Sequence, residues 1–226
     1  MKQSSVLFDL DGTLTDSAPG IFRSTRYALE RLNAADGVER PVPHESELRW
    51  IVGPPLLNSF AKLVGADKAA TMLAIYRERY AEVGMFENTV YPGIVGVLEA
   101  LKASGYRLFV ATSKLETSAR PILEHFGLAR YFEAIYGSQV DGSRAVKGDL
   151  IAYLIESERL AIADGAVMIG DRKHDALGAR AVGIGSIGVL WGYGDAAELT
   201  AAGADPLIET PAQIPAAVAT VLARAR

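Results

Sequence analysis

Short apolar runs and amphipathic segments alternate along most of the chain. Runs of strand length occur at residues 6–8, 106–111, 166–169 and 187–190, and polar or glycine residues follow each one. Segments with apolar residues at helical spacing separate these runs. Because strands that alternate with helices are typical of a parallel sheet covered by helices, the pattern predicts an α/β fold.

The alternation stops between residues 17 and 88, where only helical patterns occur. Apolar residues recur at helical spacing over residues 21–32 and again over residues 72–83, on either side of a stretch rich in Pro and Gly. The α/β pattern resumes at Tyr91. We therefore predict a core domain formed by residues 1–16 and 89–226, with an all-helical insertion at residues 17–88.

Composition excludes several kinds of chemistry and partner. The 226 residues include no cysteine, which rules out disulfides, Cys-ligated metal centres and a thiolate nucleophile. A net charge of -4 without a block of Lys or Arg argues against nucleic acid and membrane partners. The first apolar run is too short for a signal peptide, and no run reaches the ~18 residues of a membrane helix. We therefore expect a cytoplasmic protein.

Polar residues gather where the apolar runs end. Asp9 and Asp11 follow the first run, Thr112 the second and Asp171 the third, with Asp175 about one helical turn further on. Since open parallel sheets bind ligands beyond the carboxyl ends of their strands, these residues are candidates for one site. Two close carboxylates repel unless a cation or a proton intervenes. Hard oxygen ligands favour Mg²⁺ as that cation.

Four short motifs, taken in chain order, resemble those of the haloacid dehalogenase (HAD) superfamily. They are residues 9–14 (DLDGTL), Thr112 after an apolar strand, Lys147, and residues 170–175 (GDRKHD). The resemblance covers essentially the whole chain, because the helical segment lies where that family inserts a cap domain. It is closest to the phosphoglycolate phosphatase-like group. The fold implied is a doubly wound parallel sheet with an all-helical cap.

The resemblance implies hydrolysis of a phosphomonoester through an aspartyl-phosphate, with a role for each matching residue. Asp9 would be the nucleophile, and Asp11 the general acid and base. Asp9, Asp171 and the main-chain carbonyl of Asp11 would hold Mg²⁺. Asp175 would orient water or ligands around the ion. The residues implied in phosphate binding are Gly12, Thr112, Ser113 and Lys147.

The third motif departs from the family pattern, and the cap contains further candidate residues. The third motif commonly reads Lys-Pro, whereas Lys147 precedes a glycine, so Lys114 and Arg144 remain alternative sources of that positive charge. Residues 50–56 resemble the substrate-specificity loop of such caps. Arg49 and Gly53 are therefore candidate substrate contacts in the cap.

The function predicted is that of a Mg²⁺-dependent phosphatase, similar to phosphoglycolate phosphatase, acting on a small phosphorylated metabolite as a monomer or homodimer. Asp11 argues against a dehalogenase, which needs no acid or base there. The alternatives left open are a 5'-nucleotidase, a sugar phosphatase, a phosphomutase, a phosphonatase that uses Lys62 or Lys68, and a catalytically idle binding module.

Overall fold

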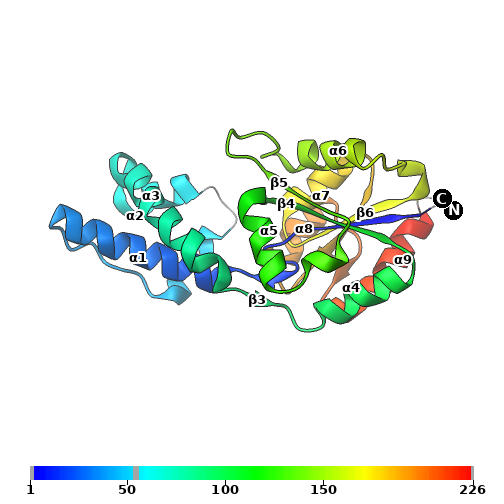
Figure 1. The fold of residues 1–226 in the computed structure, drawn as a ribbon, viewed down its shortest axis with the longest axis horizontal. Coiled ribbons are helices and arrows are strands. Elements are labelled where there is room, and N and C mark those ends of the chain that lie inside the picture. The colour runs from blue at the N-terminus through cyan, green and yellow to red at the C-terminus, as the bar shows by residue number, and fades with distance from the viewer. Residues whose placement is uncertain (1–2, 53–55, 225–226) are drawn as a thin grey trace. The chain divides into compact units, whose positions relative to one another are not determined.

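The computed structural model describes residues 3–52 and 56–224, and the chain divides into two compact units. One unit comprises Met1–Asp16 together with Val90–Arg226, and the other comprises Ser17–Thr89 (Figure 1). No helix among the described residues has the length and apolar character needed to cross a membrane. A two-stranded sheet of β2 (Thr15–Asp16) and β3 (Thr89–Val90) lies where the chain passes between the units.

The larger unit is built on a six-stranded sheet in the order β5-β4-β1-β6-β7-β8, in which every neighbouring pair is parallel. The chain adds strands on one side of β1 and then on the other, so the sheet is doubly wound, as predicted. The strands are β1 (Ser5–Phe8), β4 (Arg107–Leu115), β5 (Ala134–Ser138), β6 (Ala166–Gly170), β7 (Gly185–Val189) and β8 (Leu207–Ile208).

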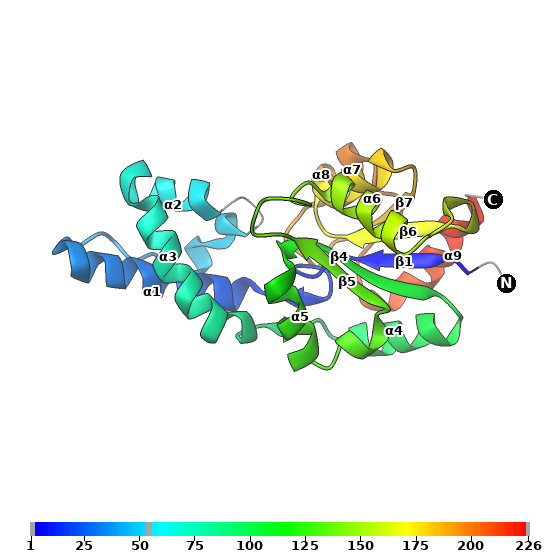
Figure 2. The same cartoon turned by 45° about the horizontal axis from the view of Figure 1, so that its top comes forward.

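Helices cover both faces of this sheet (Figure 2). They lie in two groups, one on each face, and β1 and β6 between them are buried throughout. Burial on both faces explains why these strands are continuous apolar runs rather than alternating ones. The helices of one face are α6 (Lys147–Ser157), α7 (Lys173–Ala181) and α8 (Ala196–Ala202); those of the other are α4 (Ile94–Ala103), α5 (Glu116–His125) and α9 (Ile214–Arg224).

The smaller unit is formed by helices with an apolar core of their own. Leu29, Phe60 and Met72 are fully or almost fully buried in it, and the Phe60 ring packs edge-on against Tyr76 at a centroid distance of 5.5 Å. The helical periodicity that predicted this segment therefore corresponds to the faces that pack together. Its helices are α1 (Ala18–Asp36), α2 (Leu56–Val64) and α3 (Ala66–Glu82).

One strand extends further than its sequence pattern predicts. The apolar run at 106–111 predicts that this strand ends before Thr112, but β4 continues to Leu115, with a register shift between those two residues. Beyond the end of β1, β4 still has a partner in β5, where Thr112 pairs with Gly137 and Leu115 with Ser138. The register shift therefore falls in the polar end of the strand, after its apolar run.

Candidate active site

The carboxyl ends of β1 and β6 place two carboxylates at one edge of the sheet. Asp9 directly follows β1, and Asp171 directly follows β6. The Asp9 amide donates to the Ile169 carbonyl at 2.9 Å, so the pairing of the two strands extends to Asp9. Asp171 is fully buried and Asp9 is 9% exposed. The parallel register thus brings residues distant in sequence to one place.

Lys147 lies between two of the carboxylates. Its Nζ is 3.0 Å from Oδ1 of Asp9 and 2.7 Å from Oδ1 of Asp175, and it donates to the Ala111 carbonyl at 2.8 Å. Burial opposes the ammonium charge, but the charges of Asp175 and Asp9 outweigh it and raise the pKa of Lys147 above its ordinary value. Lys147 therefore carries its charge at neutral pH.

Three buried carboxylates converge beside that ammonium. Asp9, Asp171 and Asp175 each offer an oxygen, all within 4.8 Å of one another. Burial, followed by the charges of Asp175 and Asp9, raises the pKa of Asp171 well above its ordinary value. Burial likewise raises the pKa of Asp9, although Lys147 opposes this. Three carboxylates against one ammonium leave an excess of negative charge that a divalent cation would neutralise, and hard oxygen donors fit Mg²⁺.

The chain reverses direction in a tight turn after Asp9. The Gly12 amide donates to the Thr15 carbonyl at 2.8 Å, and Leu14 donates to the Leu10 carbonyl at 2.9 Å. Gly12 has a φ of +81°, and a Cβ at this position would collide with the Asp171 carboxylate. Both the backbone conformation and the lack of space therefore require glycine. Because its amide is already paired, Gly12 provides space here rather than an available N–H group.

Asp11 faces a second cation, Lys114. Its Oδ2 accepts a hydrogen bond from Lys114 Nζ at 2.6 Å, whereas its Oδ1 is buried with no hydrogen-bond partner among the described residues. The hydroxyl of Thr112 is buried and accepts from the Lys114 amide at 3.2 Å, which leaves its own proton for another acceptor. The Ser113 carbonyl accepts from the Ser138 hydroxyl at 2.8 Å.

The remaining candidates are divided between the two units. Of the three cations considered for the third motif, Lys147 contacts Asp9, Lys114 contacts Asp11, and Arg144 lies 3.2 Å from Glu116. In the smaller unit, Arg49 begins the 3-10 helix Arg49–Ile51. Gly53 lies outside the described residues.

Sequence reasoning missed a loop that contacts this site. In residues 191–194, which follow β7 closely, the Tyr193 amide donates to Oδ2 of Asp171 at 2.8 Å, and the Trp191 indole donates to the Thr13 carbonyl at 3.1 Å. The available signal was the sequence Trp-Gly-Tyr-Gly at the carboxyl end of a predicted strand. The apolar pattern indicated where the strand ends but not that the loop after it contacts Asp171.

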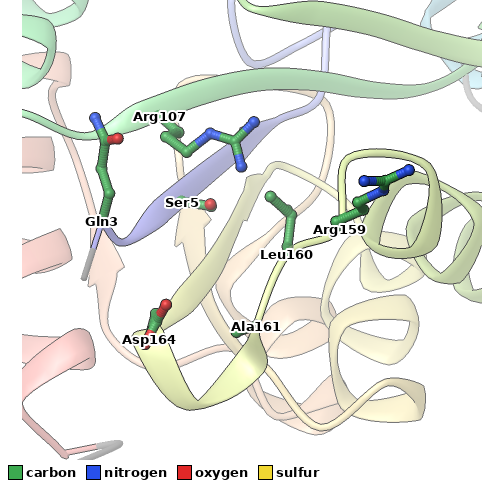
Figure 3. Close-up of a pocket in the computed structure, with 7 residues that line it drawn as sticks. All are labelled: Gln3, Ser5, Arg107, Arg159, Leu160, Ala161 and Asp164. Carbon is green, nitrogen blue, oxygen red and sulfur yellow. The ribbon is translucent and has the colours of Figure 1, made fainter. Parts of the chain in front are cut away.

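A pocket of about 290 Å³ lies at the opposite ends of the strands (Figure 3). Ser5 and Arg107, which begin β1 and β4, are among the residues that line it. Arg107 lies 2.7 Å from Glu133 and 3.5 Å from Glu158, so its charge is already balanced. The pocket is separate from the carboxylate cluster and lacks its chemistry.

Comparison with known proteins identifies the family to which this arrangement belongs. The family model for haloacid dehalogenase-like hydrolases matches residues 6–189. A haloacid dehalogenase-like family hydrolase of known structure from Streptococcus pneumoniae is 34% identical, with a TM-score of 0.84 over 95% of this chain and 98% of that one. The chain belongs to the haloacid dehalogenase-like hydrolase family.

Two relatives whose names denote phosphatase activity, and one named as a kinase, are similar over most of this chain. A 5'-nucleotidase from Pseudomonas aeruginosa is 47% identical over 89% of both chains. A phosphoglycolate phosphatase from Caulobacter vibrioides is 32% identical over 98% of this chain and 93% of that one. The tyrosine-protein kinase PtkA of Mycobacterium tuberculosis is 44% identical over 84% of this chain, which spans only 63% of that longer protein. Within its family, the chain is a phosphatase.

Proposed function

We propose that the chain is a Mg²⁺-dependent phosphatase that hydrolyses a small phosphomonoester through an aspartyl-phosphate on Asp9. The observation that supports it most strongly is the position of Lys147, whose ammonium lies 3.0 Å from the Asp9 carboxylate in a buried acidic cluster. A nucleophile that must approach an anionic phosphoryl group needs such a neighbouring charge to offset their repulsion. The fold alone does not show that such a charge lies beside the nucleophile; the contact between Lys147 and Asp9 does.

In the first half of the reaction, an oxygen of Asp9 forms a bond to phosphorus as the bond between phosphorus and the ester oxygen breaks. Asp11 donates its proton to the departing oxygen, so the leaving group departs as a neutral alcohol. The hydroxyl of Thr112 donates to a phosphoryl oxygen, and Ser113 beside it completes that side of the phosphate contact. Lys147 stabilises the charge of both reacting groups.

In the second half, water attacks phosphorus and the bond between phosphorus and Asp9 breaks. Asp11, now ionised, takes a proton from that water, and inorganic phosphate leaves. The buried Oδ1 of Asp11, which has no hydrogen-bond partner among the described residues, supports this exchange. Lys114, on Oδ2, holds the carboxylate from its other side. The same residue therefore serves both halves of the cycle.

The residues that would hold Mg²⁺ are Asp9, Asp171 and the main-chain carbonyl of Asp11. Both oxygens of Asp175 are already engaged, Oδ1 by Lys147 and Oδ2 by the Arg172 amide at 3.1 Å. Asp175 therefore orients the site from outside the ligand set. When bound, the ion supplies positive charge against the phosphoryl oxygens.

Mg²⁺ is expected to stabilise the protein against heat. At about 100 times its dissociation constant a ligand contributes about 2.7 kcal/mol, or a Tm increase of about 5–10 °C for a chain of this size. Because the pKa of Asp171 is raised in the fold, protons compete with the cation, and the increase should shrink as pH falls towards that pKa. Thermal melts with Mg²⁺ and with EDTA measure this.

The matched variants for that experiment are Asp171→Asn and Asp149→Asn. Asp171→Asn removes a carboxylate of the cluster and should abolish the Tm increase. Asp149 is exposed at the start of α6, and its replacement should leave the increase unchanged. An undiminished Mg²⁺ response in Asp171→Asn would contradict the proposed ligand set.

Asp11→Asn is expected to lower the rate of phosphate release by about 10²–10⁴-fold. With p-nitrophenyl phosphate, whose leaving group needs little protonation, the first half of the reaction should be less affected than the second. Rapid mixing should therefore show a burst of nitrophenolate followed by slow turnover. An equal loss of rate in both halves of the reaction would contradict the role of Asp11 as general acid and then general base.

The relative at 47% identity favours nucleoside 5'-monophosphates as the substrate class, ahead of phosphoglycolate and sugar phosphates. We propose that the Ser17–Thr89 unit acts as a cap that selects the leaving group of the substrate. Arg49 is the first residue of this unit to test as a substrate contact. The experiment ranks these esters by kcat/KM for inorganic phosphate release with Mg²⁺. The highest kcat/KM with nucleoside 5'-monophosphates would support the proposal.

Other outcomes of the same panel distinguish the alternatives. An isomerised sugar phosphate without free phosphate would indicate a phosphomutase. Cleavage of a phosphonate would indicate a phosphonatase. Transfer of phosphate from ATP to tyrosine would indicate a kinase. Absence of turnover across the whole panel would indicate an idle binding module.

A further inference from the structure

Residues 191–194 contact the acidic cluster, although the proposed reaction assigns them no step. Trp191 and Tyr193 are both half-buried, and the segment follows β7 at the edge that carries Asp9 and Asp171. Half-buried aromatic residues beside a site of hydrolysis can bind substrate or shape the site. The contacts of this loop favour the second role.

The loop holds the Asp171 carboxylate by one of its oxygens. The Tyr193 amide donates to Oδ2 at 2.8 Å, while the Thr13 hydroxyl donates to Oδ1 at 3.3 Å. Each oxygen thus has a donor from a different segment, so rotation of the carboxylate would break one of the two hydrogen bonds. One donor is a main-chain group, and its position depends on the path of the loop.

The loop packs closely against one side of Asp171. A Cβ at Gly192 would collide with the Cβ of Asp171 and with the main-chain carbonyl of Gly12. On the other side, the Trp191 indole donates to the Thr13 carbonyl at 3.1 Å. The loop therefore packs against both the Asp171 side chain and the turn that follows Asp9.

The same loop also contacts both stretches of the larger unit that adjoin the smaller one in sequence. The Tyr193 hydroxyl donates to Oδ1 of Asp16 at 2.8 Å, and the Trp191 ring packs edge-on against Tyr91 at a centroid distance of 6.4 Å. Asp16 ends the first stretch of that unit, and Tyr91 lies at the start of the second. Hydrogen bonds and ring packing to several separate segments therefore fix the loop.

We propose that residues 191–194 form a positioning element that sets the orientation of the Asp171 carboxylate and of the Gly12 turn for cation binding. The main-chain amide of Tyr193 and the indole of Trp191 are its principal contacts. This inference rests on the Mg²⁺ site of the proposed function, but not on the identity of the substrate or on turnover.

The test measures cation binding without substrate. Mg²⁺ binding by calorimetry, or Mn²⁺ binding by electron paramagnetic resonance, gives a dissociation constant for the folded protein. Gly192→Ala should weaken binding by about 10-fold or more, because the added methyl group displaces the carboxylate. Gly96→Ala is the matched control, since a Cβ at Gly96 on α4 meets no atom within 4 Å, and it should bind as wild type.

A second variant covers the case in which Gly192→Ala does not fold. Trp191→Phe keeps an aromatic ring at this position but removes the hydrogen bond to Thr13 together with part of the ring surface that packs near Tyr91. Binding should weaken by about 5-fold, of the order expected for the loss of one hydrogen bond. Wild-type affinity in the folded variants, or no cation binding by the wild-type protein, would overturn the inference. Cation binding without phosphatase activity would instead contradict the proposed function alone.

Discussion

Asp9→Asn is expected to lower kcat for phosphate release by at least about 10⁴-fold, with every substrate that the wild-type protein hydrolyses. The amide cannot attack phosphorus to form the aspartyl-phosphate. Asp175 also contacts Lys147 in the same cluster, but its other oxygen already accepts a hydrogen bond from the Arg172 amide. The measurement is inorganic phosphate release under saturating substrate and Mg²⁺, with the fold checked by circular dichroism.

Asp149→Asn is the control for that substitution. It makes the same chemical change at an exposed position on α6 and should retain wild-type kcat. If Asp9→Asn released phosphate at a rate near that of the wild type, Asp9 would not be the nucleophile. A comparable loss in both variants would indicate a general effect of removing a carboxylate.

Lys147→Met is expected to damage both stability and catalysis. The Lys147 side chain is 3% exposed and lies within 3.0 Å of two carboxylates, so its removal leaves buried negative charge without a partner. Loss of one member of a buried ion pair costs about 3–5 kcal/mol of unfolding free energy. Urea unfolding measures that cost, and kcat/KM is expected to fall by about 10³-fold.

Lys102→Met is the matched control, because Lys102 is exposed on α4 and its ammonium donates to the carbonyl oxygen of Arg130 at 3.1 Å, with no ion pair among the residues that the structure describes. Its unfolding free energy should change by less than about 0.5 kcal/mol. Mg²⁺ should recover part of the stability lost in Lys147→Met but not its activity. Wild-type kcat/KM in a folded Lys147→Met protein would contradict the role proposed for the lysine.

The parallel sheet and the convergence of the carboxylates could be predicted because two rules act together. Fully buried strands must be apolar, which made β1 and β6 visible in the pattern. Chain polarity then places whatever follows such strands at a common edge. Asp9 and Asp171 each follow a strand directly, so their proximity needed no knowledge of the contacts between the strands.

Other features could not be predicted because the sequence pattern does not encode them. β5 and β8 lie at the two edges of the sheet. β5 is only partly buried, and its sequence Ala-Ile-Tyr-Gly-Ser is not a continuous apolar run, while β8 has only two residues. The ion pair between Lys114 and Asp11 depends on the extension of β4 beyond its apolar run. The contacts of Tyr193 arise from the path of a loop, since a main-chain amide leaves no signature in residue type.

The most direct test of the account is to trap the phosphorylated protein. Brief reaction of the Asp11→Asn variant with substrate and Mg²⁺, followed by borohydride, reduces an acyl phosphate to the alcohol and converts the modified aspartate to homoserine. Peptide mass spectrometry should then find homoserine at position 9. Phosphate release accompanied by homoserine at another position, or by no modified aspartate, would contradict the assignment of Asp9 as the nucleophile.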